Sequence, residues 1–432
     1  MRYRLSRESA YWLIGLLTLA LCGYRAATQS VVHDEAFTYL KFLSGGWRSI
    51  FRLFDANNHV LYSVLAKLSI TCFGVSGFTL RLPTLAAEAG LLYFLARYCE
   101  RRLGAEGPLL FAAIAWNPML LDYAAAARGY TLGLMFLFAG LRYAPAHYCR
   151  TGIAFGLAVA SNLTMAVSAV ALALVFVRDP RRLVAAGAAG LATAAIILFK
   201  PLKSAKLDMF YYGASSLGEW AQSMVRPMLR HNPDFAGPLG AEPLLTLAQW
   251  LILPALLWLL WKRQPIGLAL LACIAMLMVA HWSVGVLYPL DRTGLYLVPL
   301  FLLALWESLP ARGAAVLAGL LTLQNISQLG VGHFVVWGYD AATRPAMAAV
   351  CAEARGPATL RAFWFHQPAL EFYRRTLCPD RVAPIAREPE LTLQGADFYA
   401  GSGRAAADLK PPAYRVIFAD QSTGLTVAVP FD

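Results

Sequence analysis

A succession of long apolar runs constrains this chain more than any other feature. The first run covers residues 11–24 and follows Arg2, Arg4 and Arg7. Further charge-poor runs lie at about 82–99, 107–121, 129–143, 151–177, 183–199, 244–261, 265–282, 293–308 and 313–330. Runs near this length can cross the hydrocarbon core of a bilayer as helices. Only 14% of the residues are charged, against about 25% in soluble domains, so the sequence predicts a mainly α-helical, polytopic membrane protein.

Basic residues between the runs predict their orientation, because Lys and Arg gather in cytoplasmic loops. The first run is followed by Arg25 rather than by a small-x-small cleavage site, which favours a retained helix with a cytoplasmic N-terminus. The arginine-rich connections that follow are all cytoplasmic only if 151–177 forms two short helices that turn at Ser161-Asn162. The resulting prediction is eleven transmembrane helices and a C-terminus on the outer face.

The segments predicted on the outer face are long, covering about 28–81, 200–243 and 331–432. Segment 58–73 is apolar but contains Lys67, so we expect a helix that lies at the outer interface. The second outer loop is basic, with Lys200, Lys203, Lys206, Arg226 and Arg230. Such a loop suits a phosphate-bearing lipid. The net charge of +12 comes from arginines scattered between apolar runs, which indicates lipid headgroups rather than nucleic acid.

The composition becomes typical of a soluble domain after Gly330. The string ATLRAFWFHQ predicts a strand and PALEFYRRTL a helix, and YRVIFADQ and TGLTVAV predict two strands joined through a Gly turn. Residues 331–432 are therefore expected to form a small α/β domain on the outer face, beside a transmembrane domain at 1–330. Of the seven cysteines, Cys351 and Cys378 fall in the small domain, either as a disulfide or as two separate thiols.

Polar residues with chemical potential gather in the segments predicted to lie outside. The acids of His33-Asp34-Glu35 stand side by side in the first turn that leaves the membrane. Asn57-Asn58-His59 and Arg81 follow in the same outer segment. Two later outer turns contain Asp122, Arg128, Tyr130, Tyr288, Asp291 and Arg292. Carboxylates, a histidine and arginines on one face indicate a reaction with an anionic substrate.

The order of four motifs, HDEAFTYL, NNHVLYSVLAKL, FTLRLPTLAAEAGLLYFLAR and AAAARGYTL, resembles the GT-C membrane glycosyltransferases. Within them it is similar to the bacterial protein O-mannosyltransferases and the lipid A aminoarabinose transferases. The resemblance covers roughly residues 10–145 and, less closely, 288–299, and it does not extend to the C-terminal domain. It implies a bacterial inner-membrane enzyme that transfers a sugar from a polyprenyl-phosphate donor to a lipid, polysaccharide or protein at the outer face, with inversion.

The resemblance and the chemistry together suggest roles for the outer residues. A carboxylate base at the attacking hydroxyl and cations at the departing lipid phosphate would both accelerate the transfer. We expect Asp34 to be the base, Glu35 to position it or a metal, and Asp122 to be a second acid. The residues expected to bind the substrate are His59, Arg128, Tyr130 and Arg292, followed by Lys203 and Lys206. The sequence has no DxD motif and no spaced His pair, so we predict no metal ligands and leave a divalent metal open.

Each of these roles has a structural alternative. Asp122 could pair with Arg128 as a loop salt bridge, Arg128 could snorkel at its helix end, and Arg292 could pair with Asp291. Lys203 and Lys206 could bind headgroups without specificity. Glu88, an acid inside an apolar run, is left out of the site. Two other functions are a flippase for lipid-linked sugars and an envelope scaffold that binds glycan, but a transporter would favour repeated halves and charges near mid-span.

Overall fold

The computed structural model describes residues 2–52, 54–206, 209, 212–232 and 235–431. The chain divides into two compact units, and each is described here by itself. The helical unit contains Met1–Gly23, Phe51–Leu65 and Leu82–Gly330. The mixed unit contains Tyr24–Ile50, Ala66–Arg81 and Val331–Asp432. The small C-terminal sheet is therefore grouped with two segments from the N-terminal half of the chain, Tyr24–Ile50 and Ala66–Arg81.

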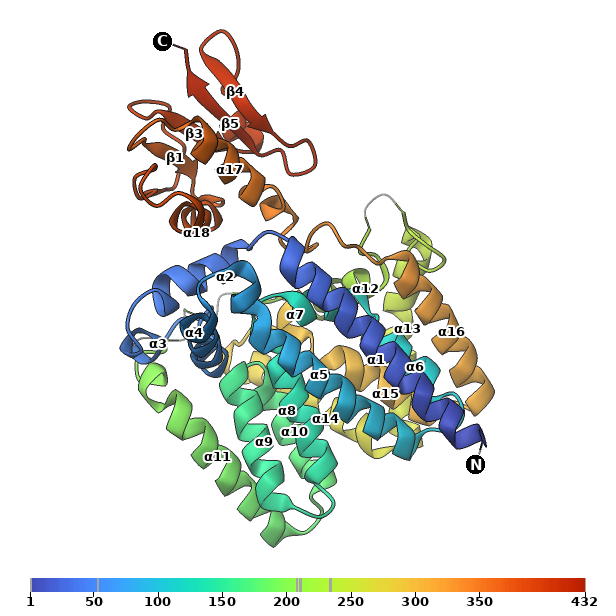
Figure 1. Cartoon of the computed structure of the whole chain (residues 1–432). Coiled ribbons are helices and arrows are strands. Elements are labelled where there is room, and N and C mark those ends of the chain that lie inside the picture. The colour runs from blue at the N-terminus through green and yellow to red at the C-terminus, as the bar shows by residue number, and fades with distance from the viewer. Residues whose placement is uncertain (1, 53, 207–208, 210–211, 233–234, 432) are drawn as a thin grey trace. The chain divides into compact units, whose positions relative to one another are not determined.

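Helices form at the predicted apolar runs (Figure 1), so the mainly α fold is confirmed. Four of the described helices contribute residues to both units: α1 (Arg2–Thr28), α3 (Arg48–Arg52), α4 (Val60–Phe73) and α5 (Gly77–Arg102). The others of the helical unit are α6 (Gly107–Ala115), α7 (Pro118–Ala125), α8 (Tyr130–Tyr143), α9 (Tyr148–Ser161), α10 (Met165–Phe176), α11 (Pro180–Leu202), α12 (Leu217–Leu229), α13 (Glu242–Lys262), α14 (Pro265–Val284), α15 (Leu297–Ser308) and α16 (Ala311–Ser327).

In the part of the chain that the structure describes, four helices are long and apolar enough to cross a membrane: Arg7–Thr28 of α1, α11, α13 and α14. The pair α7 and α8, bent by 107°, would make a fifth. Large apolar side chains point outward on these helices, and Ile196 of α11 is 85% exposed. Lipid tails can cover such side chains, so the chain is a multi-pass membrane protein. The count of eleven spans stays a prediction, because α10 and α15, which fall in predicted spans, are shorter than a full span.

The predicted division of 151–177 is confirmed. Helix α9 ends at Ser161, and Asn162 takes an extended conformation with φ −162° and ψ 123°. Its side-chain oxygen accepts hydrogen bonds from the backbone N–H and the hydroxyl of Thr164, which satisfies donors at the start of α10. By contrast, the run at 107–121 is broken between α6 and α7, where Pro118 begins a new helix capped by the Asn117 side chain.

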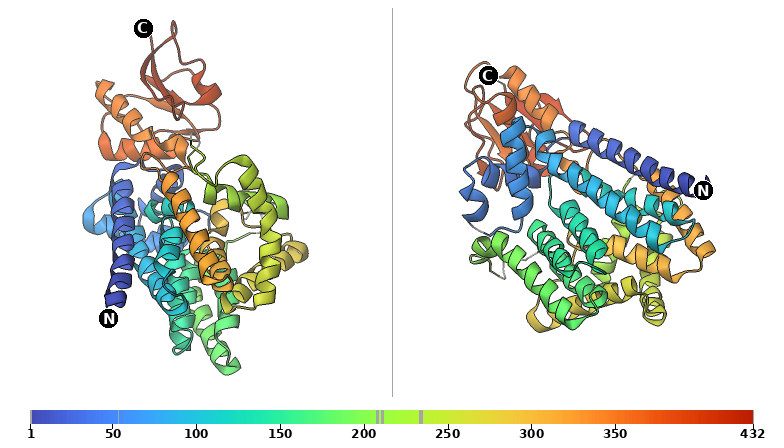
Figure 2. Two further views of the ribbon diagram at one scale, coloured as in Figure 1. Left: turned by 90° about the vertical axis from the view of Figure 1, so that its right-hand side faces the viewer. Right: turned by 60° about the horizontal axis from the view of Figure 1, so that its bottom comes forward.

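Helix α9 packs against both α8 and α11 (Figures 1 and 2). Glycine makes the contact with α11 close. A Cβ atom at Gly152 would lie 2.1 Å from the carbonyl oxygen of Ala186, and one at Gly156 would lie 2.4 Å from that of Gly190. Small residues of this kind let two membrane helices approach until their backbones touch.

The mixed unit is built on a five-stranded sheet with strand order β2-β1-β3-β5-β4. Strands β1, β2 and β3 are parallel, whereas β5 pairs with β3 and β4 in antiparallel fashion. Besides the shared helices, the elements of this unit are α2 (His33–Thr38), η1 (Tyr39–Leu43), η4 (Gly338–Asp340), α17 (Thr343–Glu353), β1 (Leu360–Phe363), α18 (Gln367–Leu377), β2 (Arg387–Glu388), β3 (Phe398–Gly401), η5 (Gly403–Ala406), β4 (Tyr414–Ala419) and β5 (Thr426–Pro430).

The predicted strand, helix and C-terminal hairpin of this unit are all present. Strand β1 is shorter than predicted, because Trp364, Phe365 and His366 form a turn that leads into α18. The turn of the β4–β5 hairpin contains Gly424 with a φ of +67°, a conformation that glycine adopts without strain. Helices α17 and α18 pack against each other and against the sheet, and the Cys351–Cys378 disulfide joins α17 to the residue that follows α18.

Candidate functional site

Arg128 lies in the sharp bend between α7 and α8 of the helical unit. The hydroxyl of Thr131 donates to the carbonyl of Tyr123 at 2.7 Å and so ties the start of α8 to the end of α7. The bend passes close to its surroundings at Gly129, where a Cβ atom would lie 2.1 Å from the Ser161 carbonyl oxygen and 2.6 Å from His59 Nδ1. Only glycine fits this position, which explains the Arg-Gly-Tyr order seen in the sequence.

The Arg128 guanidinium is buried against the segment that precedes α4. It donates to the backbone carbonyl of Asn57 at 3.1 Å and to the side-chain oxygen of Asn57 at 2.9 Å. One of its terminal nitrogens also lies 3.1 Å from Nε2 of His59. The structure therefore joins two of the predicted phosphate-binding residues, Arg128 and His59, in direct contact.

The protonation of His59 follows from its partners. The backbone N–H of Gly129 donates to His59 Nδ1 at 3.0 Å, so Nδ1 must present its lone pair. Burial, together with the nearby positive charges of Arg128 and Arg292, lowers the pKa of His59 well below 6.5. The neutral ring then has its one proton on Nε2, where it faces the Arg128 amino group. Two donors meet at this point, and an anionic oxygen could accept from both.

Tyr130 and Arg292 belong to the same region of the helical unit. The Tyr130 ring packs edge-on against His59 with a centroid distance of 5.1 Å. Arg292, in η3 (Asp291–Gly294), stacks its guanidinium 4.6 Å from the ring centre of Tyr212. The Tyr212 hydroxyl donates to Asp291 at 2.9 Å, and its ring and hydroxyl thus hold both residues of the Asp-Arg pair.

Asp122, predicted as a second acid, is completely buried in α7. The structure gives it a close neighbour that sequence reasoning missed: Nε2 of His231 lies 3.1 Å from Oδ2 of Asp122. His231 follows α12, a helix that packs against both α7 and η3. The backbone N–H of His231 donates to the side-chain oxygen of Gln328. No local pattern around His231 indicated this contact.

Lys203 and Lys206 are exposed, unlike Arg128 and His59. Lys203 immediately follows α11, and its ammonium group lies 4.4 Å from the ring centre of Phe199. An exposed lysine on an apolar helix end is suited to lipid headgroups.

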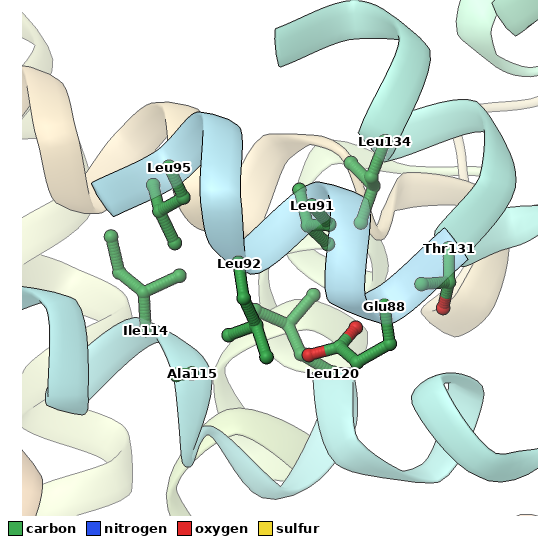
Figure 3. Close-up of a pocket in the computed structure, with 9 residues that line it drawn as sticks. All are labelled: Glu88, Leu91, Leu92, Leu95, Ile114, Ala115, Leu120, Thr131 and Leu134. Atoms are coloured by element: carbon green, nitrogen blue, oxygen red, sulfur yellow. The ribbon is translucent and has the colours of Figure 1, made fainter. Parts of the chain in front are cut away.

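Glu88 lines a small cavity in the helical unit (Figure 3). Leucines from α5 and residues of α6, α7 and α8 surround it, and Thr131 supplies the second polar side chain. The volume of about 20 Å³ leaves room for about one water molecule. This cavity is too small for a sugar or a lipid phosphate, which agrees with leaving Glu88 out of the site.

Asp34 and Glu35 belong to the mixed unit, at the start of α2. Both oxygens of Glu35 bind Arg81, with Nε donating to Oε1 at 2.9 Å and Nη2 to Oε2 at 2.6 Å. The backbone N–H of Val32 also donates to Oε2 at 3.0 Å. Arg81 further donates to the carbonyls of Ala26, Gln29 and Ser30 at the end of α1. Glu35 is thus part of a buried ion pair that fixes the turn before Asp34.

The described residues contain no group of side chains arranged to bind a metal. Among the described residues, no three His, Cys, Asp or Glu side chains are grouped so that they could hold an ion. The Glu35 oxygens accept hydrogen bonds from Arg81 and from the Val32 N–H.

Comparisons with known proteins support the fold. No protein-family model and no curated protein matches this sequence. Two crystal structures of ArnT from Cupriavidus metallidurans match over 96% of this chain and 97% of theirs, with 14% sequence identity. The TM-score is 0.55 for ArnT bound to undecaprenyl phosphate and 0.56 for the apo state. The predicted resemblance to the aminoarabinose transferases is thus confirmed at the level of the fold.

Proposed function

We propose that this protein is a membrane glycosyltransferase that takes a sugar from a polyprenyl-phosphate donor. The observation that carries the proposal is the pair of donors formed by Arg128 and His59 Nε2. It is buried in a fold shared with ArnT, one structure of which contains undecaprenyl phosphate. In this proposal the pair binds the donor phosphate, Arg292 adds positive charge as that phosphate leaves, and Tyr130 supports the His59 ring.

The reaction we propose is a single displacement at the anomeric carbon. Asp34 accepts the proton of the acceptor hydroxyl as its oxygen attacks, the bond to the lipid phosphate breaks, and the sugar is transferred with inversion. Glu35 holds the Asp34 turn through Arg81. Asp122, beside His231, is the second acid. Lys203 and Lys206 would attract the lipid phosphate before it enters. The site is proposed to face the outer side of the inner membrane, with the N-terminus in the cytoplasm.

Donor turnover by purified protein in nanodiscs tests the phosphate-binding role. A hydrogen bond to a charged group contributes about 1.5–3 kcal/mol, so Arg128→Ala should raise the donor KM or lower kcat by about 10- to 150-fold. Arg97→Ala is the matched control, because Arg97 lies in the same unit but its side chain is 42% exposed and pairs with Glu100 on the same helix. Equal kinetics in both variants would remove Arg128 from the donor site.

The base is tested by Asp34→Asn, which keeps the shape of the side chain. We expect kcat to fall by about 10²–10⁴ with little change in donor binding. Near-normal turnover would exclude Asp34 as the base, and loss of donor binding would make it a donor ligand instead. A wild-type protein that moves lipid-linked sugar across vesicles without transferring it would be a flippase.

A further inference from the structure

We infer that Asp340 is a positioning residue for Asp34, and that the C-terminal sheet serves to hold the turn that contains Asp34. This inference rests on the proposed function, in which Asp34 is the base. All of the contacts that carry it lie within the mixed unit.

The backbone of the Asp34 turn is fixed by two acids. The first N–H groups of a helix have no partner inside that helix and need an acceptor from elsewhere. At the start of α2, the N–H of Val32 donates to Glu35, and the N–H of His33 donates to Oδ2 of Asp340 at 2.5 Å. Asp340 lies 307 positions further along the chain. It therefore supplies an acceptor that the local sequence cannot provide.

The side chain of His33 is held by residues that follow β1. Its Nδ1 lies 2.7 Å from the backbone carbonyl of Phe365, so that this nitrogen donates a hydrogen bond. The ring packs edge-on against Trp364 with a centroid distance of 6.1 Å. The residue immediately before Asp34 is consequently held through both its backbone and its side chain.

Asp340 is buried beside residues that follow the strands of the sheet. Its side chain and that of His366 are completely buried, and His366 Nδ1 lies 3.8 Å from Asp340 Oδ1. The other nitrogen of His366 lies 2.7 Å from the hydroxyl of Ser402. The backbone carbonyl of Asp340 accepts from the hydroxyl of Thr343 at 2.7 Å, which anchors it to the start of α17.

His366 and Ser402 lie at the edge of the sheet where ligands commonly bind in α/β folds. His366 follows β1 and Ser402 follows β3, so both lie beyond the carboxyl ends of adjacent parallel strands. β2 lies on the other side of β1, which makes the β1–β3 boundary the point where the strand order reverses. Open α/β sheets commonly bind their ligands at this position. Here the position receives the Asp34 turn of the same chain.

Three variants test the inference, each assayed for donor turnover and for hydrogen exchange of peptides from 29–38. Asp340→Ala removes the acceptor for the His33 N–H, whereas Asp340→Asn keeps an acceptor oxygen of the same shape. Asp420→Ala is the matched control, because Asp420 lies in the exposed hairpin turn of the same unit. Since small misplacements of a reacting group cost about 10²-fold in rate, we expect that loss in kcat for Asp340→Ala, with an unchanged donor KM.

We also expect faster exchange at 29–38 in Asp340→Ala, recovery of both properties in Asp340→Asn, and no effect of Asp420→Ala. Wild-type kcat in Asp340→Ala would overturn the inference, as would equal losses in Asp340→Ala and Asp340→Asn with loss of protection throughout the sheet. If the wild-type protein turns over no polyprenyl-phosphate sugar, the proposed function fails. The exchange measurement then decides separately whether Asp340 holds the turn, and unchanged exchange in Asp340→Ala would refute that.

Discussion

Replacing Arg81 by methionine should loosen the turn that contains Asp34 far more than replacing an exposed arginine would. The side chains of Arg81 and Glu35 are both 0% exposed. Arg81 donates two hydrogen bonds to Glu35 and three to the backbone carbonyls of Ala26, Gln29 and Ser30. Arg81→Met would leave the Glu35 carboxylate buried without its cation, which costs about 3–5 kcal/mol. At 1.36 kcal/mol per factor of ten, this corresponds to about 10²- to 10⁴-fold easier opening.

Hydrogen exchange measured by mass spectrometry on peptides covering 26–36 reports this opening directly. The matched control is Arg415→Met, because Arg415 pairs with Glu353 at the surface of the same unit and such pairs contribute about 0–1 kcal/mol. The double variant Glu35→Gln/Arg81→Met should exchange more slowly than Arg81→Met, because no uncompensated charge remains. Wild-type exchange rates in Arg81→Met would refute the claim that the ion pair holds the turn.

Four further predictions concern the pH dependence at His59, the disulfide, the topology and the role of Glu35. The lowered pKa of His59 means that the unfolded chain binds a proton below pH 6.5 that the folded protein does not. Stability should therefore fall as the pH drops below that value, and His59→Gln should reduce this dependence in thermal melts. Replacing Cys351 and Cys378 by serine should destabilise the mixed unit by about 3–4 kcal/mol, measured as faster exchange in α17 and α18. A cysteine at exposed position 390, with the native exposed cysteines replaced, should react with an impermeant maleimide on intact spheroplasts, and labelling only after lysis would reverse the topology. Glu35→Gln should leave any divalent-cation requirement for turnover unchanged, whereas a raised requirement in a metal titration would make Glu35 a ligand.

The sequence predicted the helices because their signals are local. Apolar runs end at Gly, Pro and Asn, and each of these residues acts on its own backbone. The turn at Ser161-Asn162 could be placed from the arginine-rich connections on either side, and the Asn162 side chain accepts from the N–H of Thr164 there. The β4–β5 hairpin could be placed from a local signal, since Gly424 permits the positive φ that its turn requires.

The partners of the site residues could not be predicted in this way. Arg81 was recognised as a polar residue of the predicted outer segment, but no local pattern pairs it with Glu35, 46 positions earlier. The contact of Asp122 with His231 and that of His33 with Asp340 depend on how distant elements pack. Amino-acid patterns indicate which residues must be buried or capped, whereas the choice of partner is made by the tertiary fold.

The two adjacent acids at the start of α2 show how tertiary partners can give identical side chains different roles. Asp34 and Glu35 have the same functional group and neighbouring positions, so the sequence alone gives them overlapping roles. The fold separates them, because Glu35 is neutralised by Arg81 and accepts the Val32 N–H. A metal at Glu35 would have to displace Arg81 and break that buried ion pair, at a cost of about 3–5 kcal/mol. Glu35 is therefore better suited to holding the turn than to binding an ion. Since Asp340 fixes the same turn through the His33 N–H, two buried acids hold the backbone just before Asp34. This arrangement suits a base that must keep its position while a lipid-linked donor and an acceptor enter and leave.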